Sequence, residues 1–297
     1  GNLSKLNELI NTANYAKAEF YLYDLIQKDP NDYNLNKNLG MVLLAQKKYQ
    51  GALQSFEKCY FDNNSDTDIL LNLSFLFMKV QDHAQCIKFS EEAINIDPKL
   101  AGVFQNLATC YLEIHQFDQA LGYADKALEI RGGLNSKEIL KYDDFINLYS
   151  DILLAKKDFN QFIKFCESIL DTGHFSPELF IKLLRQDSKK IKKRYLKVVE
   201  NIINEPTQFS NDVDKNAKQA SANICLAEYH KTNNTKSEQY FFKANDHIVK
   251  MQRAPIYARQ QMYLDLVNYE SQLRYCHIHY NHLHLFLQLI IETHLYC

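Results

Sequence analysis

The amino-acid sequence predicts an all-α protein, a right-handed superhelical solenoid of antiparallel helix pairs. Three observations lead to this prediction. Three segments of the chain align without a gap when the sequence is shifted by 34 residues, as repeated structural units do. Only 8 glycines and 5 prolines interrupt the 297 residues, which favours long helices over tight turns. Large and small apolar residues recur at fixed positions of each period, as packing between crossed helices requires.

The register of the repeat is set by a leucine that is followed by a small residue, at Leu39-Gly40, Leu73-Ser74 and Leu107-Ala108. Further small residues are expected where the two helices of a unit cross, at Ala52, Cys86, Ala120, Cys59, Ala93 and Ala127. Prolines close the first and third units at Asp29-Pro30 and Asp97-Pro98. The predicted regular units are 1–32, 33–66, 67–100 and 101–132.

This pattern resembles the tetratricopeptide family, whose unit has the same period, the same alternation of small and large residues and a proline after its second helix. The resemblance implies a stack of helical hairpins, each touching only its neighbours. It also implies that the first helix of each unit lines a concave groove that binds other polypeptides. The predicted function is therefore a non-enzymatic protein–protein interaction scaffold that holds a peptide or a partner helix in this groove.

The pattern is weaker after Gly132-Gly133. An insertion at 134–142 precedes a degenerate hairpin in which Phe162 takes a normally small position, so looser or re-angled packing is expected. Ser176-Pro177-Glu178 has the cap-then-proline order that opens a helix. We interpret 133–250 as degenerate hairpins that end in a repeat-like unit at about 217–250, and 251–297 as a C-terminal helix with an irregular, histidine-rich tail.

Asparagine recurs one residue before the buried leucine of three units, at Asn38, Asn72 and Asn106, and Asn223 takes the same place in the last hairpin. A column of amides can donate to and accept from the backbone of an extended peptide. This arrangement is similar to the asparagine ladder in the tetratricopeptide region of O-GlcNAc transferases. The alternative is that asparagine is simply common at this position.

An apolar groove that suits an amphipathic helix is expected beside this column. Its predicted peptide-binding residues are Lys37, Met41, Phe75, Met78 and Thr109, and Leu44, Leu71, Gln105 and Leu112 flank them. The alternative for Phe75 and Met78 is packing into the next unit.

Tetratricopeptide co-chaperones bind a terminal carboxylate with lysine, arginine and asparagine side chains, and this family pattern is only partly present. Lys37 and Asn72 match it. Met41 stands where asparagine is needed, and Gly102 and Asn106 stand where the cations should be. A carboxylate clamp of this kind is therefore not predicted.

Charge and motifs exclude several other functions. A net charge of −2 and a pI near 6.6 give no general attraction to nucleic acid. The basic run 189–194 fits a solvated helix face better than a binding patch. No apolar stretch reaches the roughly 18 residues of a membrane span. Seven cysteines without a Cys-x-x-Cys pair, and no signal sequence, indicate a reducing cytoplasm.

No motif for a nucleophile, phosphate loop or metalloprotease is present, so we predict no catalytic residue, no cofactor and no metal. Five of the ten histidines nevertheless lie in the tail, including His277, His279, His282 and His284. A zinc site is the alternative interpretation there, although the spacing fits no standard structural zinc pattern.

A second resemblance leaves one functional alternative open. Stretches from Ile191 to Leu266 look like the end of the repeat region in bacterial tetratricopeptide–sulfotransferase fusions. This implies that the chain is the substrate-recruiting part of a larger enzyme. The catalytic domain is absent here, because a phosphate loop needs glycine and no glycine follows Gly173.

Overall fold

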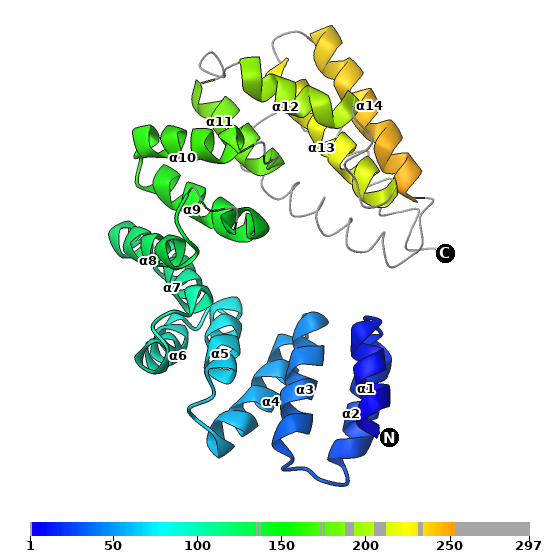
Figure 1. Cartoon of the computed structure of the whole chain (residues 1–297), viewed down its shortest axis with the longest axis vertical. Coiled ribbons are helices and arrows are strands. Elements are labelled where there is room, and N and C mark those ends of the chain that lie inside the picture. Colours follow the sequence, from blue (N-terminus) through cyan, green and yellow to red (C-terminus); the bar gives the residue numbers. More distant parts are fainter. Residues whose placement is uncertain are drawn as a thin grey trace. The chain divides into compact units, whose positions relative to one another are not determined.

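The computed structural model describes residues 2–252 except 135, 137, 173, 175, 188–192, 205–211 and 231–233. Regular structure in this part of the chain is entirely helical, which confirms the predicted all-α class (Figure 1). The chain divides into two compact units, Gly1–His174 and Phe175–Cys297.

The first unit consists of successive helical hairpins, each with a first helix, called helix A here, and a second, called helix B. The pairs are α1 (Asn2–Asn11) with α2 (Tyr15–Ile26), α3 (Tyr33–Ala45) with α4 (Tyr49–Asp62), α5 (Thr67–Lys79) with α6 (His83–Ile96), α7 (Ala101–Glu113) with α8 (Phe117–Ile130), and α9 (Asp143–Ala155) with α10 (Phe159–Asp171). A short 3-10 helix, η1 (Ile139–Lys141), precedes α9. The first four pairs lie within the four repeat units that the sequence predicts.

Aspartates start several of these helices by accepting hydrogen bonds from the first free backbone N–H groups. The side chain of Asp32 accepts from the N–H of Leu35, and Asp66 accepts from Asp68 and Ile69. Asp82 and Asp158 play the same part at the start of α6 and α10. These caps satisfy donors that have no partner inside the helix.

The turn between helix A and helix B has the same backbone conformation in every hairpin of the first unit. One residue of each turn has a positive φ, and none of these residues is glycine: Ala13, Lys47, Gln81, His115 and Lys157. A left-handed residue ends a helix by folding the chain back over its last carbonyl groups. The recurrence of this turn makes the connections equal in shape, so that the helices keep their register.

Small residues lie at the helix crossings, as predicted. Ala52, Cys86 and Ala120 are fully buried, and so are Cys59, Ala93 and Ala127 at the second set of positions. Gly40 shows why size matters, because a Cβ atom added there would lie 2.7 Å from the ring of Phe56. The described cysteines, Cys59, Cys86, Cys110, Cys166 and Cys225, are all buried free thiols, so Cys59, Cys86 and Cys225 serve packing as predicted.

Packing in the first unit runs between neighbours. Each helix B packs on the helix A of the next hairpin, and the A helices also pack on one another, α5 against α7 and α7 against α9. Elements in contact are therefore never far apart in the chain. This is the packing of a solenoid, in which stability is a sum of terms from neighbouring repeats.

The insertion and the α9–α10 hairpin depart from the regular pattern. Phe162 and Phe165 of α10 are buried, and Tyr149 of α9 stacks on Phe165 with ring centroids 4.6 Å apart. With these large side chains between them, α9 and α10 approach each other along less of their length than α7 and α8 do. This is the looser packing that Phe162 predicts. The first compact unit includes this hairpin and ends at His174.

The second unit contains α11 (Pro177–Asp187), α12 (Lys193–Asn204), α13 (Asp212–Tyr229) and α14 (Asn234–Gln252). Helix α11 begins at Pro177 as predicted, and the N–H of Leu179 donates to the Ser176 hydroxyl at 3.4 Å. The last hairpin, α13–α14, has longer helices than those of the first unit and begins at Asp212, before the expected start at about 217 (Figure 1). The histidine-rich tail, and with it the zinc alternative, lies outside the described residues, as does most of the basic run 189–194.

Candidate peptide-binding face

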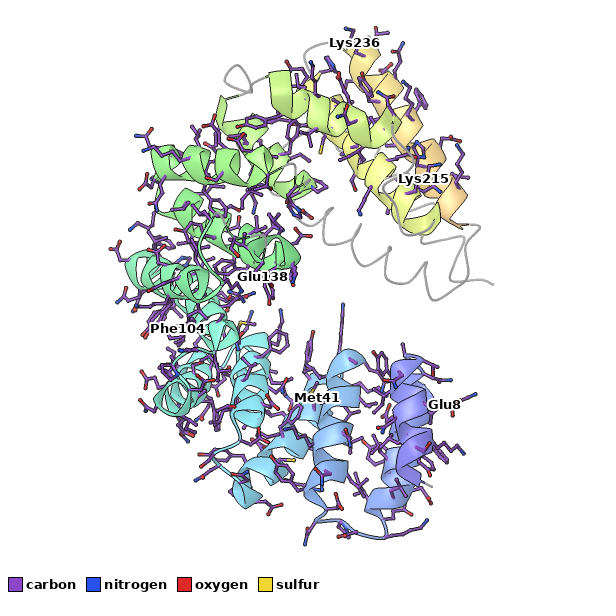
Figure 2. All side chains as sticks on the ribbon, in the orientation of Figure 1. Glu8, Met41, Phe104, Glu138, Lys215 and Lys236 are labelled. Atoms are coloured by element: carbon purple, nitrogen blue, oxygen red, sulfur yellow. The ribbon has the colours of Figure 1, made fainter. Side chains whose placement is uncertain are left out.

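Six side chains on three A helices form the candidate site, which we call the A-helix strip: Lys37 and Met41 on α3, Leu71 and Phe75 on α5, and Gln105 and Thr109 on α7. The repeat places them in two columns, since each residue recurs at the same position of the next unit. Five of the six are partly exposed, and Met41 is 47% exposed (Figure 2). The strip is thus a mixed surface with an apolar part at Met41, Leu71 and Phe75.

Two of the predicted apolar contacts differ in burial. Met78 is only 7% exposed and belongs to the buried core of the first unit, so the prediction that it faces a ligand is wrong. Its place in the repeat is on the same side of α5 as Phe75, so its burial comes from packing on the core of the first unit, the alternative that the sequence left open for it. Phe75 packs partly on the same core, and the Lys79 ammonium lies 5.2 Å from its ring centroid. Phe75 therefore still offers a ring edge to the surface.

The expected column of amides is not an open row. Asn106 is 6% exposed, and its Nδ2 donates to Ser74 Oγ at 2.7 Å, which links α7 to α5. The corresponding Asn223 is fully buried, and its Nδ2 donates to the Gln219 carbonyl. Asn72 is partly exposed and donates to the Asp68 carbonyl, while Asn38 is partly exposed on α3. Only Asn38 and Asn72 thus remain as candidates for contact with a peptide.

Lys37 on α3 is already paired with two aspartates at the start of α5. Its ammonium donates to Asp66 at 2.8 Å and to Asp68 at 3.1 Å, and the Tyr33 hydroxyl also donates to Asp66. Burial alone would lower the pKa of Lys37, but the two carboxylates more than offset this and raise it. A lysine that is already paired with two aspartates is poorly suited to hold a ligand carboxylate. The pairing of Lys37 is consistent with the sequence pattern, which does not predict a carboxylate clamp.

The pairing at Asp66 makes stability depend on pH. Burial alone would raise the pKa of Asp66, but hydrogen bonds from Lys37 and Tyr33 lower it below the ordinary value of 3.8. The folded state therefore gains stability from ionised Asp66 above about pH 4 and loses it as the pH falls through the lowered pKa.

We expect Asp66→Asn, which keeps a capping side chain, to cost about 1 kcal/mol of unfolding free energy at neutral pH. The difference from wild type should shrink below about pH 4, because both chains then carry a neutral side chain. Urea denaturation at several pH values measures this. Asp68→Asn is the control, because the Asp68 side chain is 72% exposed. A gap that stayed constant down to pH 2 would contradict the assignment.

Sequence reasoning missed one group next to the strip. Arg131 follows α8, and its Nη2 donates to Gln105 Oε1 at 2.8 Å. The only signal in the sequence was a lone arginine before Gly132-Gly133, which did not distinguish it from a surface residue.

Within the described ranges, no group of three or more His, Cys, Asp or Glu side chains is placed to hold a metal ion. The helices of that same part of the chain are too short or too polar to cross a membrane.

The stacked hairpins with their constant period define a helical-repeat solenoid. Residues 67–100, one of these repeats, match the family model described as Tetratricopeptide repeat. The fold is similar to that of a tetratricopeptide repeat protein from Parabacteroides merdae, with a TM-score of 0.57 and 14% identity, covering 88% of this chain and 95% of that one. It is also similar to pilF of Pseudomonas aeruginosa, with a TM-score of 0.52 and 13% identity, covering 80% and 94%. At such identities the likeness shows the fold alone.

Two curated relatives match shorter stretches. The mouse BBSome complex member BBS4 is 28% identical over 91 residues, which is 31% of this chain and 18% of that protein. A probable UDP-N-acetylglucosamine–peptide N-acetylglucosaminyltransferase, SEC, of Arabidopsis thaliana is 32% identical over 85 residues, which is 27% of this chain and 9% of that protein. The chain thus spans less than a fifth of the length of either relative.

Proposed function

We propose that the chain is a protein-interaction scaffold that binds a peptide or a partner helix across the A-helix strip. The observation that carries this proposal is the exposure of Met41 beside the half-open Leu71 and Phe75. Such a surface offers an adaptable apolar contact to an amphipathic ligand. The tetratricopeptide class supports the general role, and the name of the mouse relative describes that protein as a member of a complex.

The proposal is tested by selecting ligands for the purified chain from a random peptide library and measuring their affinity by fluorescence anisotropy. We expect Met41→Glu to weaken the binding of selected peptides about tenfold, because a charge would then oppose the most exposed apolar contact of the strip. Phe61→Glu is the matched control, since Phe61 is 85% exposed on the helix B of the same hairpin. If no peptide is selected, or if both variants lose affinity equally, the strip is not the binding face.

A second candidate function is the recruitment of substrates to a catalytic domain outside this chain. The local match to the Arabidopsis transferase supports it, although that match covers 9% of the transferase. The sulfotransferase resemblance lies partly on residues outside the described part and stays a prediction. Sequencing the gene on both sides of the region that encodes this chain tests this candidate. An adjoining catalytic domain in the same reading frame would favour it, and stop codons at both borders would exclude it.

A further inference from the structure

Arg131 has an unusual environment for a charged side chain. Its guanidinium carbon lies 4.5 Å from the ring centroid of Tyr142 and 4.5 Å from that of Phe145. Phe145 is fully buried at the start of α9, and Tyr142 comes from the end of the insertion. The insertion and α9 thus place two aromatic rings against the guanidinium, and burial lowers the pKa of Arg131.

The guanidinium lacks a counter-charge. Nη2 donates to Gln105, but Nε and Nη1 are buried without a hydrogen-bond partner. No ion pair joins Arg131 to a carboxylate in the described part of the chain. The nearest acidic residues in the sequence bond elsewhere: Glu129 pairs with Lys126 at 3.2 Å, Asp125 accepts a hydrogen bond from Tyr149, and Glu138 pairs with Lys141 at 2.8 Å.

Arg131 is only half-buried as a whole, but its buried Nε and Nη1 are costly to leave without hydrogen-bond acceptors, and a bound ligand could supply one. The position of Arg131 after the last turn of α8 explains why a cation is tolerated there, because the carboxyl end of a helix is partly negative. The end of the helix does not, however, supply a hydrogen-bond acceptor for Nε and Nη1 of Arg131. A carboxylate supplies an acceptor for one of them, Nε–H or Nη1–H, and its second oxygen can accept from the other N–H of Nη2, which lies next to either group in the guanidinium plane.

We propose that Arg131 anchors a carboxylate of the polypeptide that binds along the A-helix strip, an inference that rests on the proposed function. The hydrogen bond to Gln105 joins Arg131 directly to the strip. The ligand is then a peptide whose apolar side chains lie over Met41, Leu71 and Phe75 and whose carboxylate reaches Arg131. Tyr142 is 42% exposed and Phe145 is fully buried, so Tyr142 is the outer of the two rings.

A first experiment tests the anion site without any peptide. The full chain is labelled with nitrogen-15, and the Nε–H resonance of Arg131 is followed while sodium acetate replaces sodium chloride at constant ionic strength. We expect a saturable shift of this resonance. No shift would mean that water alone satisfies the guanidinium, and it would overturn the proposal.

A second experiment uses peptides selected for binding to the wild-type chain. We expect Arg131→Met to weaken binding about tenfold or more, and Arg131→Lys to weaken it less, because lysine keeps the charge but loses the fork. Lys58→Met, on an exposed side chain of α4, removes the same charge and should bind like wild type. Amidated peptides and peptides with glutamate changed to glutamine distinguish a terminal carboxylate from a side-chain one.

Two outcomes separate this inference from the proposed function. If no peptide binds the wild-type chain, the proposed function fails, and the acetate titration still decides whether Arg131 is an anion site. If peptides bind but Arg131→Met binds them equally well, only the inference fails. The melting temperature of Arg131→Met without ligand should equal or exceed that of wild type, since an unpaired buried charge is removed. A marked fall in that temperature with unchanged affinity would assign Arg131 a purely structural role.

Discussion

Replacing Phe56 with alanine is expected to lower the free energy of unfolding of the first unit by about 3–5 kcal/mol. Phe56 is fully buried in α4, and its ring lies against the backbone of Gly40 in α3. The change removes a large apolar side chain from the crossing of the two helices, and Gly40 has no side chain that could fill the resulting cavity.

Phe61→Ala is the control for this experiment, because the same substitution on the same helix concerns a side chain that is 85% exposed. Urea denaturation followed by far-ultraviolet circular dichroism measures both variants. A loss for Phe56→Ala no greater than that for Phe61→Ala would show that Phe56 does not hold the α3–α4 hairpin together.

Asn106→Ala is expected to destabilise the first unit by about 1–3 kcal/mol. The substitution removes the hydrogen bond that joins Asn106 on α7 to Ser74 on α5, and it leaves a small cavity between two repeats. Thermal unfolding measures the effect.

Asn72→Ala provides the comparison for Asn106→Ala. Asn72 occupies the same position of the preceding repeat, but it is partly exposed and bonds only within its own helix. Little change in melting temperature is expected for it. If both variants unfolded at the wild-type temperature, the amide of Asn106 would have no structural role.

The sequence was sufficient to predict the hairpins because their period is constant. Leu39, Leu73 and Leu107 fix the helical register, and a change of register would move them out of the core. The small residues at the crossings, such as Ala120, were predictable for the same reason. The helix limits follow from capping residues such as Asp66, which act on residues close by in the chain.

The binding face was harder to predict because it depends on how far the next repeat covers each side chain. Asn72 and Asn106 have the same place in the repeat, yet only Asn106 reaches Ser74 of the preceding unit and becomes buried. The pair one unit earlier is Asn72 and Gly40, at the positions of Asn106 and Ser74. Asn72 cannot make the same hydrogen bond, because Gly40 has no hydroxyl group to accept it. Periodicity gives the position of a residue on its helix but not the identity of its neighbours across a repeat boundary.

Arg131 could not be recognised for a related reason. Its environment is created by Tyr142 and Phe145, which follow an insertion that has no counterpart in the other units. No repeat comparison could predict where the chain returns after Gly132-Gly133.

The packing of each hairpin on its neighbours also has a consequence for synthesis. Because helices of the first unit contact only elements close to them in the chain, a hairpin has most of its partners as soon as the following one is made. The apolar face of a hairpin can therefore be covered before residues far along the chain have been synthesised. The first unit can thus fold in order from its N-terminal hairpin, with little apolar surface exposed to aggregation at any stage.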